Sequence, residues 1–259
     1  MQIDPLTPHL GVRVSGVDLA KITPEDATDL RALMERHLVV FFEGQNLNPE
    51  GFLRFGTSLG ELEPPAIAAP FQPTLDGDLR AINYLEVDEG IERGTYSDQW
   101  HSDGSYFERP SHAALLQPAI LPSLGGDTLW SSMYAAYDAL PDSLRRDLEG
   151  LSALHSAGPQ GEFVHPVIRV NPESGQRGLY INRLFVKEIV GMAERDSGEL
   201  LQVLFTHLMS PEFQLRFRWT RDVVAVWDNR FSMHFAVRDY SEPRRMLRLS
   251  LAGERPIGP

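Results

Sequence analysis

The sequence predicts a mainly β fold, a sandwich or closed roll of strands with a few inserted helices. Two patterns in the C-terminal half support this prediction. Apolar Phe213, Leu215 and Phe217 alternate with polar residues, as in a strand that buries one face. Residues 223–227 form an unbroken apolar run, which is typical of a strand buried on both faces.

The N-terminal part is predicted to contain two helices with a strand between them. Thr23 is suited to cap a helix, because a proline follows it at the first helical position and acidic residues fill the first turn. This helix should run to about Arg36, and a strand over 37–42 should follow. A second helix is expected from Asn48, with Gly60 closing it in a left-handed conformation.

Further elements are predicted in the middle of the chain. Segments 165–170 and 177–181 flank an Asn-Pro-Glu-Ser-Gly turn at 171–175, which indicates a hairpin. Helical patterns at 131–140 and 197–208 are expected as insertions between strands.

Length and composition restrict the possible classes of protein. The 259 residues contain no linker or repeat, so one domain over residues 1–259 is expected. The absence of cysteine excludes disulfides, thiolate catalysis and zinc–thiolate sites. The formal net charge is 24 − 36 = −12, which argues against a nucleic-acid partner. No apolar run is long enough for a membrane span and the first residues lack a signal-peptide pattern, so a cytoplasmic protein without membrane partners is expected.

Two histidines and one aspartate have the spacing of an iron site. His101 and Asp103 are two residues apart, so on a β-strand their side chains would leave the same face. His234, 131 positions after Asp103, would add a third ligand from a distant strand. Two imidazoles and one carboxylate on one face of a metal are expected of non-heme Fe(II) oxygenases. A His-x-Asp pair by itself is more often a hydrogen-bonded surface pair, so the surrounding residues matter.

A second group of polar residues lies near the C-terminus. Arg244 and Arg248 share one face of a predicted final strand, with Arg245 on the other. Two guanidinium groups on one face can bind carboxylates through paired hydrogen bonds. The alternative is a solvated edge strand with scattered arginines, and the pattern alone leaves the inward face open.

A third feature is the segment 125–130, Gly-Gly-Asp-Thr-Leu-Trp. Its two glycines permit an unusual turn, after which Thr128 could offer a hydroxyl to an anion. By itself the segment is better explained as an ordinary turn that enters a strand.

Together these segments resemble the taurine dioxygenase-like family of iron(II)/2-oxoglutarate-dependent oxygenases, which includes 2,4-dichlorophenoxyacetate dioxygenase. The resemblance extends in order along nearly the whole chain, through segments 10–19, 37–42, 55–62, 100–103, 125–130, 135–140, 227–230, His234 and 244–253. It implies a double-stranded β-helix (jelly-roll) core with flanking α-helices. It also implies that His101, Asp103 and His234 are the iron ligands.

The resemblance further implies a binding place for the co-substrate 2-oxoglutarate. Thr128 and Arg244 match the pair that binds its distal carboxylate. Arg248 matches an arginine near the metal-bound end of the co-substrate and the anionic group of a substrate. Counting from His234 would select Arg245 in place of Arg244, but strand parity puts Arg244 and Arg248 on one face.

The implied reaction uses Fe(II), 2-oxoglutarate and O2 and forms succinate and CO2 while a small organic substrate is oxidised. Hydroxylation is the expected outcome, although desaturation, ring formation and oxidative cleavage share its first steps. Asp103 argues against halogenation, because related halogenases lack a carboxylate at that position.

Several positions depart from taurine dioxygenase and argue against taurine as the substrate. After residues 60–63 the chain has two prolines where that enzyme has a sulfonate-binding histidine. Ser97 stands near the position of an amine-binding asparagine, and Ala157 replaces a pocket aromatic. Phe185 matches a second pocket aromatic and is a candidate substrate contact, with a role in the core as the alternative.

Two other classes of protein remain compatible with the same ligands. One is a metal-binding jelly roll without turnover that senses or binds a small molecule. The other is a metallohydrolase that uses zinc and ignores 2-oxoglutarate and O2. The residues do not determine the oligomeric state, although the resemblance is compatible with a homo-oligomer, since multimers are common among the relatives.

Overall fold

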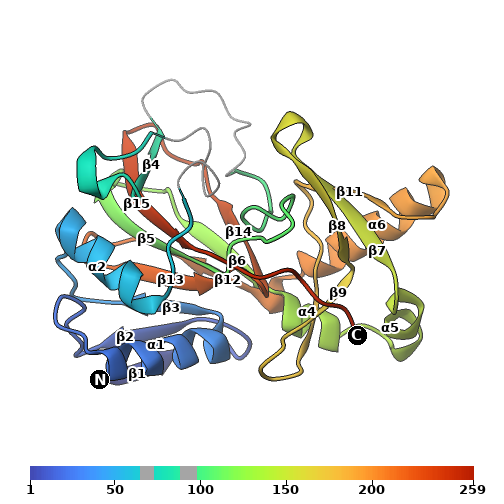
Figure 1. Ribbon diagram of the computed structural model, residues 1–259, viewed down its shortest axis with the longest axis horizontal. Coiled ribbons are helices and arrows are strands. Elements are labelled where there is room, and N and C mark those ends of the chain that lie inside the picture. The colour runs from blue at the N-terminus through green and yellow to red at the C-terminus, as the bar shows by residue number, and fades with distance from the viewer. Residues whose placement is uncertain (65–72, 88–97) are drawn as a thin grey trace.

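The computed structural model describes residues 1–64, 73–87 and 98–259, and its largest sheet has seven strands (Figure 1). All neighbours in this sheet are antiparallel except β2 and β3. The order across the sheet is β1 (Gln2–Pro5), β2 (Val12–Ser15), β3 (Val39–Phe42), β13 (Val224–Asp228), β5 (Ala113–Ile120), β15 (Arg244–Leu251) and β4 (Asn83–Val87).

A second, antiparallel sheet packs against the first. It consists of β12 (Gln214–Phe217), β6 (Thr128–Ser132) and β14 (Ser232–Ala236). Side chains from both sheets form one hydrophobic core, in which Phe41 of β3 stacks on Phe217 of β12 with ring centroids 3.7 Å apart. Trp130 and Trp227 join the same core from β6 and β13. The predicted mainly β fold is therefore confirmed, with two sheets face to face as in a jelly roll.

Two helices cover the outer face of the seven-stranded sheet. Helices α1 (Pro24–His37) and α2 (Pro49–Leu59) bury Leu30 and Phe55 in one hydrophobic core with Leu249 of β15. The predicted cap of α1 is confirmed, because the Asp26 amide donates to Thr23 Oγ1 at 3.1 Å.

The prediction that α2 ends in a left-handed conformation at Gly60 is wrong. Gly60 has φ 165° and ψ −173°, which is extended backbone. The reason is that the chain leaves α2 directly into a β-bridge between Leu62 and Leu251 and needs no reversal.

The elements between β6 and β12 form an outer layer, at the right of Figure 1. Its core contains Met133, Leu179, Leu201 and Leu204. The helices are α4 (Met133–Asp138), α5 (Asp142–Leu148) and α6 (Glu194–Leu208), and the strands are β7 (Ser152–Ser156), β8 (Glu162–Pro166), β9 (Ile168–Val170), β10 (Arg177–Leu179) and β11 (Val186–Ile189). Short 3-10 turns occur at Gly77–Leu79, Gly158–Gln160 and Pro211–Phe213.

The predicted hairpin is confirmed, since β9 and β10 pair antiparallel around the 171–175 turn. The helix predicted over 131–140 begins at Met133, because Ser131 and Ser132 pair within β6. The alternating pattern predicts a strand around 213–219, but the strand that forms, β12, covers only Gln214–Phe217.

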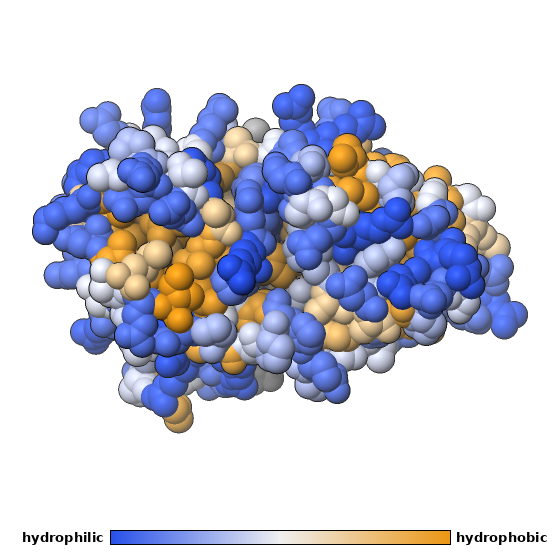
Figure 2. Space-filling model, turned by 90° about the horizontal axis from the view of Figure 1, so that it is seen from below, coloured by the Kyte–Doolittle hydropathy of each residue, from blue (hydrophilic) through white to orange (hydrophobic). Residues whose placement is uncertain are grey.

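No helix among the described residues is long and apolar enough to cross a membrane. On the face drawn in Figure 2, hydrophilic residues predominate and hydrophobic ones gather mainly in the left half.

Candidate active site

His101 and His234 are brought together by their own backbones. His234 lies on β14, and His101 forms an isolated bridge with it. The His101 amide donates to the His234 carbonyl at 3.1 Å, and the His234 amide donates to the His101 carbonyl at 2.8 Å. Residues directly opposite in such a pair project from the same face. The two imidazole centroids consequently lie only 4.2 Å apart.

Asp103 reaches the same point from a turn. The expectation that His101 and Asp103 share a strand is wrong, because the chain turns after the His101 bridge and Gly104 adopts φ +65°. The fully buried Asn229 holds this turn. Its Oδ1 accepts from the Asp103 amide at 2.8 Å, and its Nδ2 donates to the Asp103 and Ser111 carbonyls at 2.9 Å each. Asn229 lies within the segment 227–230, where no sequence pattern indicates this role.

The three side chains present ligand atoms to one point. One donor atom from each of His101, Asp103 and His234 lies within 4.8 Å of the others. The Nε2 atoms of His101 and His234 are 3.6 Å and 3.7 Å from the two Asp103 carboxylate oxygens. Ligands that share one ion at right angles lie about 3 Å apart, so small side-chain shifts would complete the coordination.

Hydrogen bonding and charge prepare these groups for a metal. His101 Nδ1 lies 2.7 Å from the Gln99 carbonyl, so this nitrogen donates and Nε2 keeps its lone pair for a ligand. Burial lowers the pKa of His101 and lowers the pKa of His234 to about 3, which keeps both imidazoles neutral. Burial raises the pKa of Asp103, but Arg248 and the two histidines outweigh it and the net shift is downward. Neutral imidazoles and a carboxylate are the states that metal binding requires.

Arg248 lies beside this cluster on β15. Its Nη2 is 2.8 Å from Asp103 Oδ2, and the side chain is almost completely buried. Arg244 lies four residues before Arg248 on the same face of β15. It is also buried, and its Nε donates to the Gly126 carbonyl at 3.2 Å. Among the described residues, Arg244 Nη2 has no hydrogen-bond partner. A buried guanidinium donor in this state fits a carboxylate acceptor.

The glycine turn makes room for Arg244. Gly126 has φ +74°, and a Cβ atom there would come within 3.1 Å of Arg244 Cδ. Thr128, two residues later, is buried at the start of β6, where its Oγ1 accepts a hydrogen bond from Trp219 Nε1 at 3.0 Å. Arg245 points away from this group and lies over the Tyr84 ring, 5.2 Å from its centroid.

Aromatic side chains line the other side of the histidines. Phe185 lies edge-on to His101 with ring centroids 6.3 Å apart, and Tyr106 lies 4.8 Å from Phe185. Both aromatic residues are nearly buried. Ser97, the remaining candidate, lies outside the described residues.

Glu63 is a buried acidic neighbour that sequence reasoning did not select as a site residue. Ser111 Oγ donates to its Oε2 at 2.5 Å. Burial raises the pKa of Glu63 to about 7, against the opposing effects of Ser111 and Arg248.

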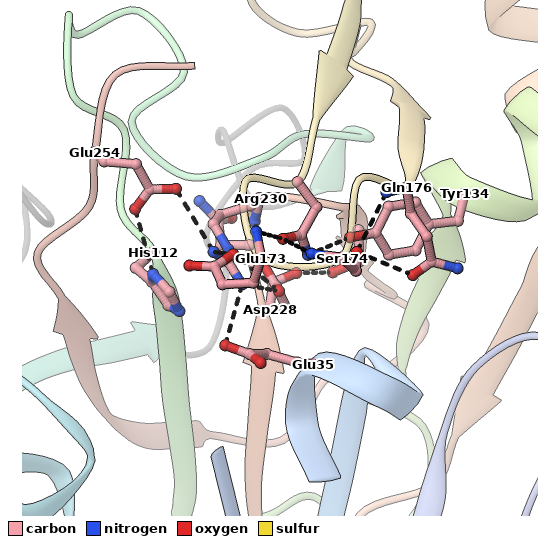
Figure 3. Close-up of polar contacts among 12 residues, drawn as sticks. Glu35, His112, Tyr134, Glu173, Ser174, Gln176, Asp228, Arg230 and Glu254 are labelled. Atoms are coloured by element: carbon pink, nitrogen blue, oxygen red, sulfur yellow. Dashed lines mark hydrogen bonds and ion pairs between the residues drawn. The ribbon is translucent and has the colours of Figure 1, made fainter. Parts of the chain in front are cut away.

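A buried ion network secures the turn between β13 and β14 (Figure 3). Arg230 is fully buried and donates to both Asp228 oxygens, from Nε at 3.1 Å and from Nη2 at 2.9 Å. Glu173 and Glu254 lie 3.4 Å and 3.6 Å from its Nη1. Burial lowers the pKa of Arg230, but the carboxylates, Asp228 first, raise it above its usual value. The network thereby fixes the turn that carries Asn229.

Three side chains that could hold one metal ion thus lie beside two buried arginines in a jelly roll. Residues 2–250 match the model of the family described as taurine catabolism dioxygenase TauD, TfdA family. The chain belongs to this family.

Named relatives of this chain are dioxygenases as well. An alpha-ketoglutarate-dependent sulfate ester dioxygenase from Pseudomonas putida is 34% identical over 100% of this chain and 91% of the relative. A taurine dioxygenase structure from Burkholderia xenovorans has a TM-score of 0.89 at 34% identity, covering 100% of this chain and 93% of the other. The structure of AAD-2 with Mn(II) and N-oxalylglycine has a TM-score of 0.87 at 26% identity, covering 98% of each chain.

These relationships confirm the predicted jelly-roll fold and the predicted enzyme class. The protein is an Fe(II)- and 2-oxoglutarate-dependent dioxygenase that uses O2, alpha-ketoglutarate being another name for 2-oxoglutarate. The non-catalytic sensor is disfavoured, because the named relatives are enzymes of this class.

Proposed function

We propose that His101, Asp103 and His234 hold the Fe(II), and that Thr128 and Arg244 hold the distal carboxylate of 2-oxoglutarate. One observation carries the proposal: three ligand atoms lie within 4.8 Å of one another beside Arg248, and Arg244 is buried on the same strand as Arg248. Arg244 is favoured over Arg245 because its Nη2 is buried without a partner among the described residues, whereas Arg245 packs on Tyr84.

Bound iron and 2-oxoglutarate supply the oxidising chemistry, and the protein supplies position, charge and a dry pocket. His101 keeps Nε2 available because its Nδ1 is engaged by the Gln99 carbonyl. Asp103 adds a carboxylate that Arg248 helps to keep ionised. Phe185 and Tyr106 exclude water from the His101 side and form an apolar wall for the substrate.

We infer that the substrate is a small organic anion, with an alkyl sulfate ester as the leading class. Arg248 would pair with the anionic group and Phe185 would contact the carbon chain. Oxidation of the carbon next to the ester oxygen converts its C–H bond to C–OH. Cleavage of the adjacent C–O bond then releases an aldehyde and sulfate. The balanced reaction is R–CH2–OSO3⁻ + 2-oxoglutarate + O2 → R–CHO + HSO4⁻ + succinate + CO2. A sulfate-ester dioxygenase among the relatives supports this class.

Taurine is not our proposed substrate. Pro64 and Pro65 follow Glu63 where taurine dioxygenase places a histidine, so the imidazole contact to a sulfonate is lost. Ala157 has no ring with which to narrow the pocket.

We further infer one domain over residues 1–259, a cytoplasmic location, and no nucleic-acid or membrane partner. The core shared by both sheets supports one domain. The net charge of −12 argues against a nucleic-acid partner, and the absence of cysteine fits a reducing, cytoplasmic location. The hydrophobic area in Figure 2 supports a homo-oligomer.

The proposal is tested by succinate release from 2-oxoglutarate in air, with Fe(II) and a medium-chain alkyl sulfate. We expect substrate-stimulated succinate matched by equal amounts of sulfate. His234→Ala should abolish both products. Succinate without sulfate would contradict the substrate class, and no succinate with any organic anion would contradict the site assignment.

The arginine assignments have a matched control on the same strand. Arg244→Leu should raise the KM for 2-oxoglutarate at least tenfold, as expected when a charged hydrogen-bond donor is removed. Arg245→Leu should change it little, because that side chain lies over Tyr84. Arg248→Leu should instead raise the KM for the alkyl sulfate. The reverse order for Arg244 and Arg245 would move the co-substrate contact to Arg245.

A further inference from the structure

We propose that Trp219 is a positioning residue that orients the Thr128 hydroxyl toward 2-oxoglutarate. The inference rests on the proposed function, because it assigns a neighbour to one of the two residues of the co-substrate site. Trp219 lies just beyond β12, 91 residues from Thr128 in sequence, and its indole contacts that hydroxyl.

The polarity of this hydrogen bond carries the inference. An indole N–H can only donate, whereas a threonine hydroxyl has one proton and two acceptor lone pairs. Trp219 Nε1 donates to Thr128 Oγ1 at 3.0 Å, so Oγ1 accepts in this contact. No acceptor for the Thr128 proton is found among the described residues. That proton is therefore directed away from Trp219 and remains available to a carboxylate.

Packing holds the donor in place. Trp219 is only 7% exposed and lies against Phe217 and Trp130, with ring centroids 5.6 Å and 6.3 Å away. Phe217 is also the β-ladder partner of Thr128, so one strand pair fixes the backbone of both residues. Accepting from Trp219 also polarises the hydroxyl, which makes its own proton a better donor.

The experiment measures the dissociation constant of 2-oxoglutarate for the Mn(II)-loaded protein by calorimetry. Trp219→Phe keeps an aromatic ring and removes the N–H, and we expect roughly fivefold weaker binding, the effect of one net hydrogen bond of about 1 kcal/mol. Thr128→Val should weaken binding at least as much. In the Thr128→Val protein, Trp219→Phe should add almost nothing, because both changes remove one interaction.

Trp130→Phe is the matched control. Trp130 is fully buried in the same core, but its Nε1 has no hydrogen-bond partner among the described residues. Phenylalanine keeps an aromatic ring beside Trp219, and the change removes no hydrogen bond to Thr128, so the dissociation constant of 2-oxoglutarate should stay within twofold. Mn(II) affinity should be unchanged in all variants, which separates co-substrate positioning from general loss of structure.

A second measurement serves if Trp219→Phe fails to fold. The chain has four tryptophans, so its indole N–H signals can be assigned by nuclear magnetic resonance. Thr128→Val should move the Trp219 signal and leave that of Trp130 in place. An unmoved Trp219 signal, or additive losses in the double variant, would overturn the inference. If both Thr128→Val and Arg244→Leu leave 2-oxoglutarate binding unchanged, the proposed co-substrate site itself fails.

Discussion

The side chain of Asn229 holds the backbone turn that carries Asp103. Its amide oxygen and nitrogen together hold three backbone groups, two of them on Asp103. Because Asp103 lies in a turn, no strand partner fixes its carboxylate. We infer that Asn229 takes the place of a strand partner and determines where this carboxylate points.

Asn229→Ala should weaken Mn(II) binding at least tenfold and lower the free energy of unfolding by about 2–4 kcal/mol, because it leaves buried backbone groups without partners. Calorimetric titration of Mn(II), well below the unfolding temperature, measures the first effect, and urea denaturation measures the second.

Asn171→Ala is the control for Asn229→Ala. Asn171 is equally buried, donates to the Tyr134 hydroxyl at 2.8 Å and accepts from the Glu173 amide at 2.9 Å, away from the histidines. It should lose stability and keep its Mn(II) affinity. Equal affinity losses in the two variants would show that Asn229 acts only through general stability.

At the scale of elements, local pattern was enough for most of the fold. The Thr23 cap, the apolar run that became β13 and the turn between β9 and β10 depend on neighbours in sequence, and all three were predicted. The sequence also allows His101, Asp103 and His234 to be selected as candidate ligands, but it does not predict their local structure, because Asp103 lies in a turn and not on a strand. Parity on β15 likewise separated Arg244 from Arg245.

Long-range contacts explain what the sequence could not predict. The bonds from Asn229 to Asp103 and from Trp219 to Thr128 join positions 126 and 91 residues apart. Asn229 lies in a turn and Trp219 beyond the end of a strand, so no periodic pattern marks either contact. The turn at Asp103 likewise depends on Asn229.

The β7–β8 strand pair contains buried histidines that bear on pH. His155 is fully buried, stacks on Tyr180 and has no hydrogen-bond partner for either ring nitrogen among the described residues. Burial lowers its pKa well below the usual value, and burial lowers the pKa of His165 to about 4. Both imidazoles are therefore neutral in the folded protein and gain protons on unfolding below about pH 6.5.

Stability should fall as the pH drops from 7.5 to 5.5. A depressed folded-state pKa leaves stability complete above the unfolded pKa of about 6.5 and removes it as the pH falls toward the folded value. His155→Phe should reduce this loss by about 1 kcal/mol at pH 5.5, since one pKa unit corresponds to about 1.4 kcal/mol. Urea unfolding of both proteins at pH 7.5 and pH 5.5 measures this difference in the free energy of unfolding. An identical pH dependence in the variant would contradict a neutral, buried His155.

At the scale of the whole molecule, the site joins the two sheets. Arg244 and Arg248 come from the seven-stranded sheet, whereas Thr128 and His234 come from the three-stranded one. A metal ion and a dicarboxylate bound among them would connect both sheets. Ligand binding and global stability should therefore be coupled.

Mn(II) with N-oxalylglycine, each at about 100 times its dissociation constant, should raise the unfolding free energy by about 2.7 kcal/mol for each bound species. Differential scanning calorimetry should show a higher melting temperature than with Mn(II) alone. Arg244→Leu should lose the increment from N-oxalylglycine and keep the increment from Mn(II). An unchanged N-oxalylglycine increment in that variant would place the carboxylate elsewhere.

The two reciprocal backbone hydrogen bonds between His101 and His234 have an evolutionary consequence. The atoms that space the two imidazoles belong to the main chain, so no side-chain replacement elsewhere in the pocket can easily alter that spacing. Substrate preference can then change through the aromatic residues Phe185 and Tyr106 while the oxidising centre stays intact. Enzymes with this architecture can therefore change their organic-anion substrate during evolution and keep the same oxidation reaction.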